Sequence, residues 1–467
     1  MTRIVIMGGG PAGYEAALVA AQHGADVTVV ERDGLGGACV LYDCVPSKTF
    51  IASAGARAAF HTADELGIRT DSQLPPVDLP VVHGRVKALA LAQSADVRNR
   101  VQREGVRVIN GTARFCDDRP GLAAHRVAAI GHDGSTEVLD ADVVLIATGA
   151  TPRVLPGAEP DGERILDWRQ IYDLPELPEH LVVVGSGVTG AEFVSAYTEM
   201  GVRVTLISSR DRVLPHEDAD AAAVLEDVYA ARGTEVVKHA RAERVERTSK
   251  GVVVHLRGGE TVEASHALMT VGSVPNTGDL GLDKIGVEPA QGGFVSVDRV
   301  SRTSVPGVYA AGDCTGLLML ASVAAMQGRI AMWHALGEGV APIKLKTVAA
   351  NVFTHPEIAT VGISQHAIDS GEVPARTIML PLATNARAKM EGLHRGFVKL
   401  FCRPATGVVI GGVVVAPSAS ELILPIALSV QNQLTVEHLT HTFSVYPSLS
   451  GSIVEAGRRL MRHDDLD

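Results

Sequence analysis

The sequence predicts an α/β protein in which one strand–turn–helix unit occurs twice and is followed by a strand-rich region. The first copy is the apolar run Arg3–Met7 with the glycine-rich turn Gly8–Gly13, and the second is Leu181–Val184 with Gly185–Gly190. Apolar runs bounded by glycine and followed by a long helical pattern are typical of parallel sheets. From residue 347 onward β-rich runs such as Val408–Val415 predict an antiparallel sheet.

Composition limits the classes of protein to consider. A chain of 467 residues with 46% hydrophobic residues is long enough for about three packed domains. Acidic residues outnumber basic ones by 53 to 42, giving a net charge of −11 without a long block of one sign, so we expect no nucleic-acid partner. Five scattered cysteines do not make a secreted disulfide framework. With no apolar run of about 18 residues and no leader pattern, we expect a cytoplasmic protein without an integral membrane segment.

The first glycine turn has the spacing of a dinucleotide-binding motif. Its glycines let the backbone approach a pyrophosphate, and the following helix offers free N–H groups and a partial positive charge. A second strand then delivers Glu31, eighteen residues past Gly13, where a carboxylate can accept ribose hydroxyls. The predicted contacts are Gly8, Gly10, Pro11, Ala12, Gly13 and Glu31.

The second turn permits a comparison within the chain. Eighteen residues after Gly190 stands Ser208, followed by Ser209 and Arg210, where the first unit has a carboxylate. A carboxylate repels a 2′-phosphate, whereas hydroxyls and a guanidinium attract it. We therefore expect a second nucleotide that can be NADPH, with NADH possible, although Arg210 and Arg212 can also be ordinary solvated charges. The predicted contacts are Gly185, Gly187, Val188, Thr189, Gly190, Ser208, Ser209 and Arg210.

Two cysteines, Cys39 and Cys44, follow the first unit five residues apart. In a regular helix five residues rise about 7.5 Å, beyond the ~7 Å that bridged α-carbons can span. The pair must therefore lie in a distorted turn if it bonds. Taken alone, two cysteines are more simply interpreted as small buried apolar residues.

The surrounding segment GGACVLYDCVPSK, residues 36–48, resembles the redox-active disulfide segment of the flavoprotein disulfide reductases, the family of lipoamide dehydrogenase and glutathione reductase. The resemblance implies that the first nucleotide fold holds FAD, with Cys44 against the flavin and Cys39 as the interchange cysteine. It also implies that Lys48 lies beside the reactive flavin nitrogen and pairs with Glu192. Gly37 and Ala38 are expected to contact the cofactor.

Other segments extend the resemblance over nearly the whole chain. ATGATP at residues 147–152 and TSVPGVYAAGD at residues 303–313 resemble the family's FAD segments, and the resemblance assigns Asp313 to the ribitol of FAD. A helix opening at Leu320 and Ala321 would direct its N-terminus at the flavin pyrimidine. The remaining expected cofactor contacts are Ala113, Thr148, Gly149, Gly272 and Gly312.

The resemblance also implies a domain organisation. We expect an FAD-binding domain at residues 1–150 and 276–345, an NAD(P)-binding domain at 151–275, and an interface domain at 346–467. NVFTHPEIATVG, residues 351–362, resembles the start of the family's dimerisation domain. The expected fold is thus two Rossmann-like dinucleotide-binding domains plus a C-terminal α+β dimerisation domain, assembled as a homodimer.

One expected motif is missing. The family has a His-Pro dipeptide followed four residues later by glutamate, and this histidine is the base for the thiols of the partner subunit. Here Tyr446 stands in place of histidine and Gly451 in place of glutamate. A positioned base contributes about 10²- to 10⁴-fold, and a phenol with a pKa of about 10 cannot replace it at pH 7. His441 could substitute only if the segment were rearranged, so we expect slow disulfide exchange, with Tyr446 at the catalytic position.

Hydride transfer from a nicotinamide to a flavin needs no such base. A chain that keeps the two cysteines but lacks the histidine and the glutamate resembles the lipoamide-dehydrogenase-like NAD(P)H quinone reductases of actinobacteria. This resemblance implies a small quinone as electron acceptor. The alternatives are a soluble pyridine nucleotide transhydrogenase, whose branch also has Tyr-Pro but lacks one cysteine, and a lipoamide dehydrogenase-like disulfide reductase. A mercuric reductase is disfavoured because the C-terminus carries no cysteine pair, and a non-catalytic redox subunit stays open. No metal site is predicted.

Overall fold

The computed structural model describes residues 1–69, 74–116 and 124–461. The chain divides into two compact units, the first comprising residues 1–49, 81–153 and 272–343, the second residues 50–80, 154–271 and 344–467. Each unit is built around its own sheets. Within the described ranges, no helix combines the length and apolar character needed to cross a bilayer.

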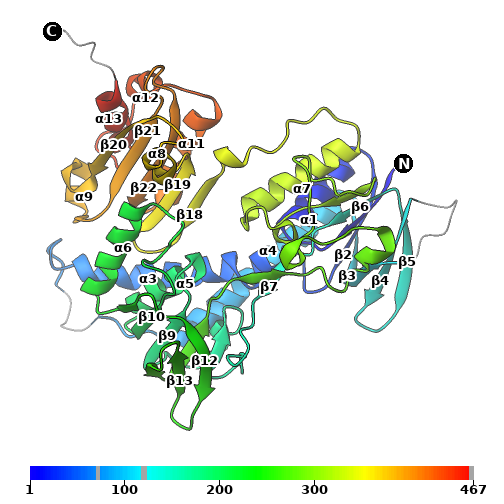
Figure 1. Ribbon diagram of the computed structural model, residues 1–467, viewed down its shortest axis with the longest axis horizontal. Helices are drawn as coiled ribbons and strands as arrows, with labels where there is room; N and C mark the ends of the chain where they lie inside the picture. Colours follow the sequence, from blue (N-terminus) through cyan, green and yellow to red (C-terminus); the bar gives the residue numbers. More distant parts are fainter. Residues whose placement is uncertain (70–73, 117–123, 462–467) are drawn as a thin grey trace. The chain divides into compact units, whose positions relative to one another are not determined.

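A seven-stranded sheet forms the centre of the first unit (Figure 1), in the order β17-β6-β1-β2-β3-β4-β5. Pairing is parallel from β17 to β3 and antiparallel from β3 to β5. Strands β1, β2, β6 and β17 are almost fully buried, as continuous apolar runs predict. The bounds are β1 Arg3–Met7, β2 Asp26–Glu31, β3 Arg107–Phe115, β4 His125–Gly131, β5 Thr136–Ala141, β6 Val143–Ile146 and β17 Val308–Ala310, with a separate ribbon of β7 Ala150–Pro152 and β16 Ser273–Pro275.

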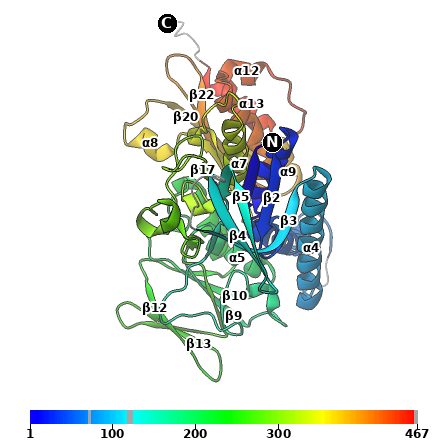
Figure 2. The same cartoon turned by 90° about the vertical axis from the view of Figure 1, so that its right-hand side faces the viewer.

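Helices cover this sheet. Helices α1 and α7 pack closely, since a Cβ on Gly328 would lie 2.2 Å from the carbonyl oxygen of Ala12. Val97 and Val101 of α4 belong to the same apolar cluster as Ile4, and Figure 2 shows α4 beside β3. The helices that begin or lie in this unit are α1 Pro11–Gln22, α2 Gly37–Leu41, α3 Cys44–Ala58, α4 Leu79–Arg103 and α7 Ala321–Ala335, and α3 and α4 also extend into the residues of the second unit.

The second unit contains the repeated fold. Its five parallel strands have the order β11-β10-β9-β15-β8 and are followed by an antiparallel three-stranded sheet, β12-β13-β14. The bounds are β8 Ile165–Asp167, β9 His180–Val184, α5 Val188–Glu199, β10 Arg203–Ile207, α6 Ala219–Ala231, β11 Glu235–Val237, β12 Ala242–Arg247, β13 Val252–Leu256, β14 Thr261–Ala264 and β15 His266–Met269.

The C-terminal part of the second unit is an antiparallel five-stranded sheet, β18-β19-β22-β21-β20, with helices α8 to α13. This confirms the antiparallel sheet, and the whole is an α/β fold with two Rossmann-like parallel sheets and a C-terminal α+β region. The bounds are β18 Ala349–Val352, β19 Glu357–Gly362, α8 Gln365–Asp369, β20 Arg376–Pro381, α9 Ala386–Met390, β21 Phe397–Cys402, β22 Val409–Ala416, α10 Ala419–Leu422, α11 Leu424–Gln431, α12 Val436–His441 and α13 Gly451–Leu460.

Candidate active site

The first glycine turn is closed by steric contacts that only glycine permits. A Cβ on Gly8, whose φ is +107°, would lie 2.3 Å from the carbonyl oxygen of Ala147, and a Cβ on Gly13 would lie 1.9 Å from that of Gly8. Around Gly10 there is open space, because a Cβ there would meet nothing within 4 Å. Gly10 is the N-cap of α1, with Pro11 in the first turn, so the N-terminus of the helix opens into this space.

Glu31 holds this turn in place. Its buried carboxylate accepts hydrogen bonds from the backbone N–H groups of Gly9 at 2.6 Å, Asp33 at 2.7 Å and Gly34 at 3.2 Å. A carboxylate has about four acceptor positions. One of these positions therefore stays available for a ribose hydroxyl. From the sequence we expected the carboxylate of Glu31 to accept both ribose hydroxyls.

The cysteine segment lies directly against the same turn. The N–H of Gly36 donates to the carbonyl oxygen of Gly9 at 2.8 Å, and a Cβ on Gly37 would lie 2.8 Å from the Cα of Gly10. Helix α2, which contains Ala38 and Cys39, ends at Leu41, and α3 begins at Cys44. The helix is thus interrupted between the two cysteines, which is the kind of turn that their spacing would require if they formed a disulfide.

Both cysteines are half-buried thiols. A hydrogen bond with Cys39, burial and the carboxylate of Asp43 all raise the pKa of Cys44, and Lys48 lowers that pKa. Lys48 follows Cys44 by four residues in α3, so both side chains lie on one face of this helix.

Thr148 and Gly149 follow β6 and lie next to Gly8. The buried hydroxyl of Thr148 has no hydrogen-bond partner among the described residues. Asn276 fixes this turn, because its side-chain amide donates to the carbonyl oxygen of Thr148 at 2.9 Å and its backbone N–H to that of Gly149 at 3.0 Å. Sequence reasoning did not identify Asn276 as a site residue.

Gly312 and Asp313 follow β17 at the same edge of the sheet. A Cβ on Gly312 would lie 3.6 Å from the Cβ of Ala12, and the N–H of Gly312 donates to the buried side chain of Gln327 on α7 at 3.0 Å. Burial, with a further contribution from Asp43, raises the pKa of Asp313 to about 6. The sequence analysis did not identify Gln327 or Asp43.

Two predicted contacts lie at other places in the first unit. Leu320 is the N-cap of α7, and its apolar side chain leaves the N-terminus at Ala321 for a ligand to cap. Ala113 lies on β3 opposite Ala129 of β4, two strands from β1.

The second glycine turn repeats the first in detail. A Cβ on Gly185 would lie 2.3 Å from the carbonyl oxygen of Thr270, and a Cβ on Gly190 would lie 1.9 Å from that of Gly185. Gly187 is the N-cap of α5, with open space around it, and is followed by Val188 and Thr189. The side chain of Val188 is 43% exposed.

The side chain of Ser208 is turned inward. It is fully buried, its Oγ lies 2.7 Å from the Oγ of Ser186, and it accepts the N–H of Arg210 at 3.1 Å. Ser209 and Arg210 are exposed, while Arg212 donates to the carbonyl oxygen of Pro215 at 3.1 Å. Ser209 and Arg210 are therefore free to face a ligand, whereas the hydroxyl of Ser208 is engaged within the protein.

The remaining predicted residues are dispersed. Glu192 is buried in the second unit and accepts the backbone N–H of Phe353 at 2.9 Å, so its pairing with Lys48 of the first unit stays a prediction. Gly272 lies at the boundary of the first unit and accepts the N–H of Arg153 at 2.9 Å. Tyr446 is 84% exposed in the loop before α13.

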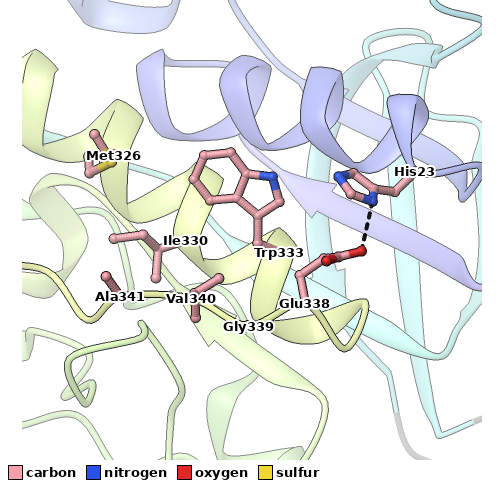
Figure 3. Close-up of a pocket in the computed structure, with 8 residues that line it drawn as sticks. All are labelled: His23, Met326, Ile330, Trp333, Glu338, Gly339, Val340 and Ala341. Atoms are coloured by element: carbon pink, nitrogen blue, oxygen red, sulfur yellow. Dashed lines mark ion pairs between the residues drawn. The ribbon is translucent and has the colours of Figure 1, made fainter.

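A separate cavity of about 420 Å³ lies on the later turns of α7 (Figure 3). Met326, Ile330 and Trp333 form its apolar side, and His23 lies 3.5 Å from Glu338 at its polar end. None of the predicted site residues lines it. We therefore do not assign this cavity to the active site.

The residues around the first turn fit FAD. An uncapped helix N-terminus beside open space suits a pyrophosphate, and the Thr148 hydroxyl and the Asp313 and Glu31 carboxylates suit the hydroxyl-rich parts of the molecule. The cysteine pair lies against the same turn. Two such turns and a thiol pair define a flavoprotein oxidoreductase with a second nucleotide site.

Comparison with known proteins agrees with this class. Residues 2–328 match the model of the pyridine nucleotide-disulphide oxidoreductases, and residues 348–457 match the dimerisation domain of that family. The chain belongs to the pyridine nucleotide-disulphide oxidoreductase family, and it is an oxidoreductase that uses FAD and NAD(P).

Relatives cover the chain at nearly full length. It is 65% identical to the NAD(P)H dehydrogenase (quinone) of Mycobacterium tuberculosis, over 100% of this chain and 95% of that protein. It is 33% identical to dihydrolipoyl dehydrogenase 2 of Haloarcula marismortui, over 97% and 96% of the two chains. The crystal structure of LpdA from Mycobacterium tuberculosis has a TM-score of 0.95 and 64% identity, covering 99% of this chain and 100% of that one.

Proposed function

We propose that the protein is a cytoplasmic, homodimeric FAD-dependent NAD(P)H:quinone oxidoreductase. NAD(P)H and a proton reduce a quinone to a hydroquinone, leaving NAD(P)⁺. The full-length relative at 65% identity, which carries the name NAD(P)H dehydrogenase (quinone), supports this substrate. The domain limits inferred from the sequence assign the two nucleotides to two separate folds. These limits are residues 1–150 with 276–345 for FAD, 151–275 for NAD(P) and 346–467 for the interface domain.

The residues of the first fold position the cofactor. The N-terminus of α1 and the turn Gly8–Gly13 bind the pyrophosphate, Glu31 accepts one ribose hydroxyl, and Asp313 accepts hydroxyls of the ribitol. Lys48 would supply a fixed positive charge to the bound cofactor. Bound FAD supplies the chemistry, by accepting a hydride from NAD(P)H and passing electrons to an acceptor.

The observation that carries the choice of acceptor is the side chain at position 446. Tyr446 occupies the position of the thiol base, its side chain is 84% exposed, and residues 442–454 contain no histidine, aspartate or glutamate. Without a base, the thiols exchange slowly with a disulfide substrate. A quinone needs no thiolate, because it accepts electrons directly.

The C-terminal surface supports the homodimer. The side chains of Phe443, Val445, Leu424 and Leu428 are all at least half exposed, although they are large and apolar. Large apolar side chains left exposed in this number are more typical of protein interfaces than of a solvated surface. Residues 348–457 match a dimerisation domain, so a second copy of the chain is the partner that we propose.

We propose that NADPH is bound at least as well as NADH. Ser208 brings no negative charge to the place where a 2′-phosphate would lie, and the exposed Ser209 and Arg210 can bind it. A substitution of Arg210 would test this preference most directly.

The test is an acceptor panel with purified holoenzyme. We expect turnover with soluble benzoquinones and naphthoquinones to exceed turnover with lipoamide or glutathione disulfide at least tenfold at equal NADPH. Cys44→Ser should leave quinone turnover within about twofold. Faster turnover of lipoamide than of any quinone would refute the proposal.

A disulfide reductase is the second candidate, because both cysteines are retained and a relative at 33% identity is named dihydrolipoyl dehydrogenase 2. The same panel separates it from the first. A soluble transhydrogenase would instead exchange hydride between NADPH and an NAD⁺ analogue faster than it reduces quinones.

A further inference from the structure

Two loops lie side by side at the carboxyl end of the parallel sheet in the second nucleotide fold. One loop follows β10 and the other follows β11, and these strands are parallel neighbours. The N–H of Ser208 donates to the carbonyl oxygen of Val237 at 2.9 Å, and the N–H of Ala240 donates to that of Ser208 at 2.9 Å. A third bond runs from the N–H of His239 to the carbonyl oxygen of Arg210 at 3.0 Å. His239 and Arg210 are therefore neighbours, although they belong to different loops.

His239 has a backbone conformation that side chains rarely adopt. Its φ is +54°, in the left-handed region, and in the described part of the chain only five residues other than glycine have a positive φ. Residues with a side chain are strained there, and such strain is concentrated at catalytic and ligand-binding sites. His239 is exposed, so packing in the core does not account for its conformation. Its hydrogen bond to Arg210 instead fixes this residue against the loop that follows β10.

Some cations of these loops are held by the protein itself. The ammonium of Lys238 lies 2.6 Å from the carboxylate of Glu226. The guanidinium of Arg212 donates to the carbonyl oxygen of Pro215 at 3.1 Å, so this side chain is turned back onto its own loop. These two side chains are therefore engaged before any ligand binds.

Arg210 and His239 differ from these cations. Their side chains have no hydrogen-bond or ion-pair partner among the residues that the structure describes. Asp211 is the exposed carboxylate that directly follows Arg210, and it offsets part of the charge of the guanidinium. An anion at this edge of the sheet is therefore bound more tightly if a second donor supports Arg210, and His239 is the neighbour that the backbone bond places there.

A phosphate on the 2′ position of a ribose suits these donors. In a nucleotide fold of this kind, the adenosine ribose lies at the end of the second strand, which here is β10. The phosphate carries about two negative charges and three acceptor oxygens. Ser209 and Arg210 offer a hydroxyl and a guanidinium on one loop, and the imidazole of His239 offers an N–H from the other, whether or not the ring is protonated. Donors from both loops can thus bind the same phosphate.

We infer that His239 is a specificity-determining residue of the second nucleotide site, where its imidazole donates a hydrogen bond to the 2′-phosphate of NADPH beside Arg210. The inference concerns binding alone, and no bond is made or broken. It rests on the proposed function, because it takes NADPH as a reductant. It also extends the site to the loop after β11, which lies outside the glycine turn and the end of β10 that the sequence analysis identified.

The test measures how the adenosine half of the nucleotide binds. Holoenzyme is assayed with NADH and ferricyanide, a general electron acceptor, so that the result does not depend on quinone reduction. Competitive inhibition constants are determined for adenosine 2′,5′-bisphosphate and for 5′-AMP, which differ only in the 2′-phosphate. For the wild type we expect the bisphosphate to bind at least about fivefold more tightly than 5′-AMP.

Two substitutions of His239 suit its backbone conformation. Glycine adopts a positive φ without strain, and aspartate, like histidine, tolerates it better than most residues. We expect His239→Gly to weaken binding of the bisphosphate about fivefold, because one charge-assisted hydrogen bond is lost, and His239→Asp to weaken it at least about twentyfold, because a carboxylate repels the phosphate. The inhibition constant for 5′-AMP, the kcat with NADH and the Tm should change little in both variants.

Lys250→Asp is the matched control for long-range charge. Lys250 lies in the turn between β12 and β13, at the opposite end of β12 from His239, and this variant changes the net charge at least as much as His239→Asp. Both inhibition constants should stay at their wild-type values, because exposed charges are screened over about 10 Å.

Three results would overturn the inference alone. They are unchanged binding of the bisphosphate in both variants of His239, an equal weakening of 5′-AMP in them, and an equal loss in Lys250→Asp. A wild-type enzyme that binds the bisphosphate no better than 5′-AMP would overturn the inference together with the choice of NADPH. Failure to reduce quinones would overturn the proposed acceptor and leave the inhibition constants standing.

Discussion

The hydroxyl oxygens of Ser186 and Ser208 lie 2.7 Å apart and are buried between the second glycine turn and the end of β10. The pair spans 22 residues, the same separation as the Gly9–Glu31 hydrogen bond in the first fold. Each fold therefore ties its glycine turn to the end of its second strand, one with a carboxylate and the other with a neutral hydroxyl. The two folds therefore differ in charge at corresponding positions.

Replacing this hydroxyl by a carboxylate should change nucleotide choice. We expect Ser208→Glu to lower kcat/KM for NADPH relative to NADH at least tenfold, about 1.4 kcal/mol, because a carboxylate repels the 2′-phosphate. Ser208→Ala removes the bond to Ser186 without adding charge and should keep the wild-type ratio. An unchanged ratio of kcat/KM for NADPH and NADH in Ser208→Glu would show that the residue at position 208 does not discriminate between nucleotides with and without the 2′-phosphate.

Removing the carboxylate of Glu31 should loosen the first turn. Glu31→Ala leaves three backbone N–H groups without their acceptor, and a buried unsatisfied donor such as that of Gly9 costs about 1–3 kcal/mol. We expect a lower Tm and a smaller fraction of bound FAD, measured by calorimetry and by the absorbance ratio of flavin to protein. Glu137→Ala removes an exposed pair with Arg107 and should leave the Tm nearly unchanged. Full FAD retention in Glu31→Ala would contradict the role of this carboxylate.

The sequence predicts the local backbone geometry of the glycine turns and strands. It does not predict which residues far along the chain become hydrogen-bond partners. The glycine turns were predictable because the steric need for glycine is local, and the antiparallel sheet because strand-forming runs recur. Helix α1 begins at Pro11, inside the glycine-rich motif, because proline suits the first turn of a helix. Gly111 lies inside β3, where a Cβ would lie 2.1 Å from the carbonyl oxygen of Ile130, so this glycine allows close strand pairing.

The direction of a side chain, and its hydrogen-bond or ion-pair partners far along the chain, leave no comparable pattern in the sequence. Ser208 was correctly placed at the end of the strand, but only the structure shows that its hydroxyl points at Ser186. In the sequence, Gln327 is one polar residue of an alanine-rich helix, and only the structure shows its hydrogen bond with the N–H of Gly312. Lys399 interrupts an apolar strand, and its partner Asp218 is 181 residues away.

The raised pKa of Asp313 predicts pH-dependent FAD binding. As a carboxylate, Asp313 accepts hydroxyl hydrogen bonds, and bound FAD therefore favours the ionised form. Since the pKa in the protein without FAD is about 6, affinity should be constant above that pH and fall, by at most about tenfold per unit, as pH drops below it. Titration of apoprotein with FAD from pH 5 to pH 8 measures this. Asp313→Asn should bind more weakly and lose the dependence, and an unchanged slope in this variant would assign the titration to another group.

The buried ammonium of Lys399 on β21 lies 2.7 Å from Asp218, the N-cap of α6, and 2.6 Å from Asp220. Lys399 and Asp218 are almost fully buried, so this ion pair joins the C-terminal sheet to the helix of the second nucleotide fold. Removing one partner of a buried pair leaves an uncompensated charge and costs about 3–5 kcal/mol. Lys399→Ala should therefore lower the Tm strongly, whereas Lys238→Ala, which breaks the more exposed pair with Glu226, should cost less than about 1 kcal/mol.

A double variant separates the ion pair from simple loss of packing. Lys399→Met fills the space of the lysine stem without its charge, and Asp218→Asn keeps the helix cap while removing the opposite charge. Because both charges are then gone, the double variant should be more stable than the sum of the two single losses predicts. Calorimetry of the four proteins gives this coupling directly. Additive losses would mean that the two side chains stabilise the second unit independently, and the contact between sheet and helix would then have to depend on apolar packing alone.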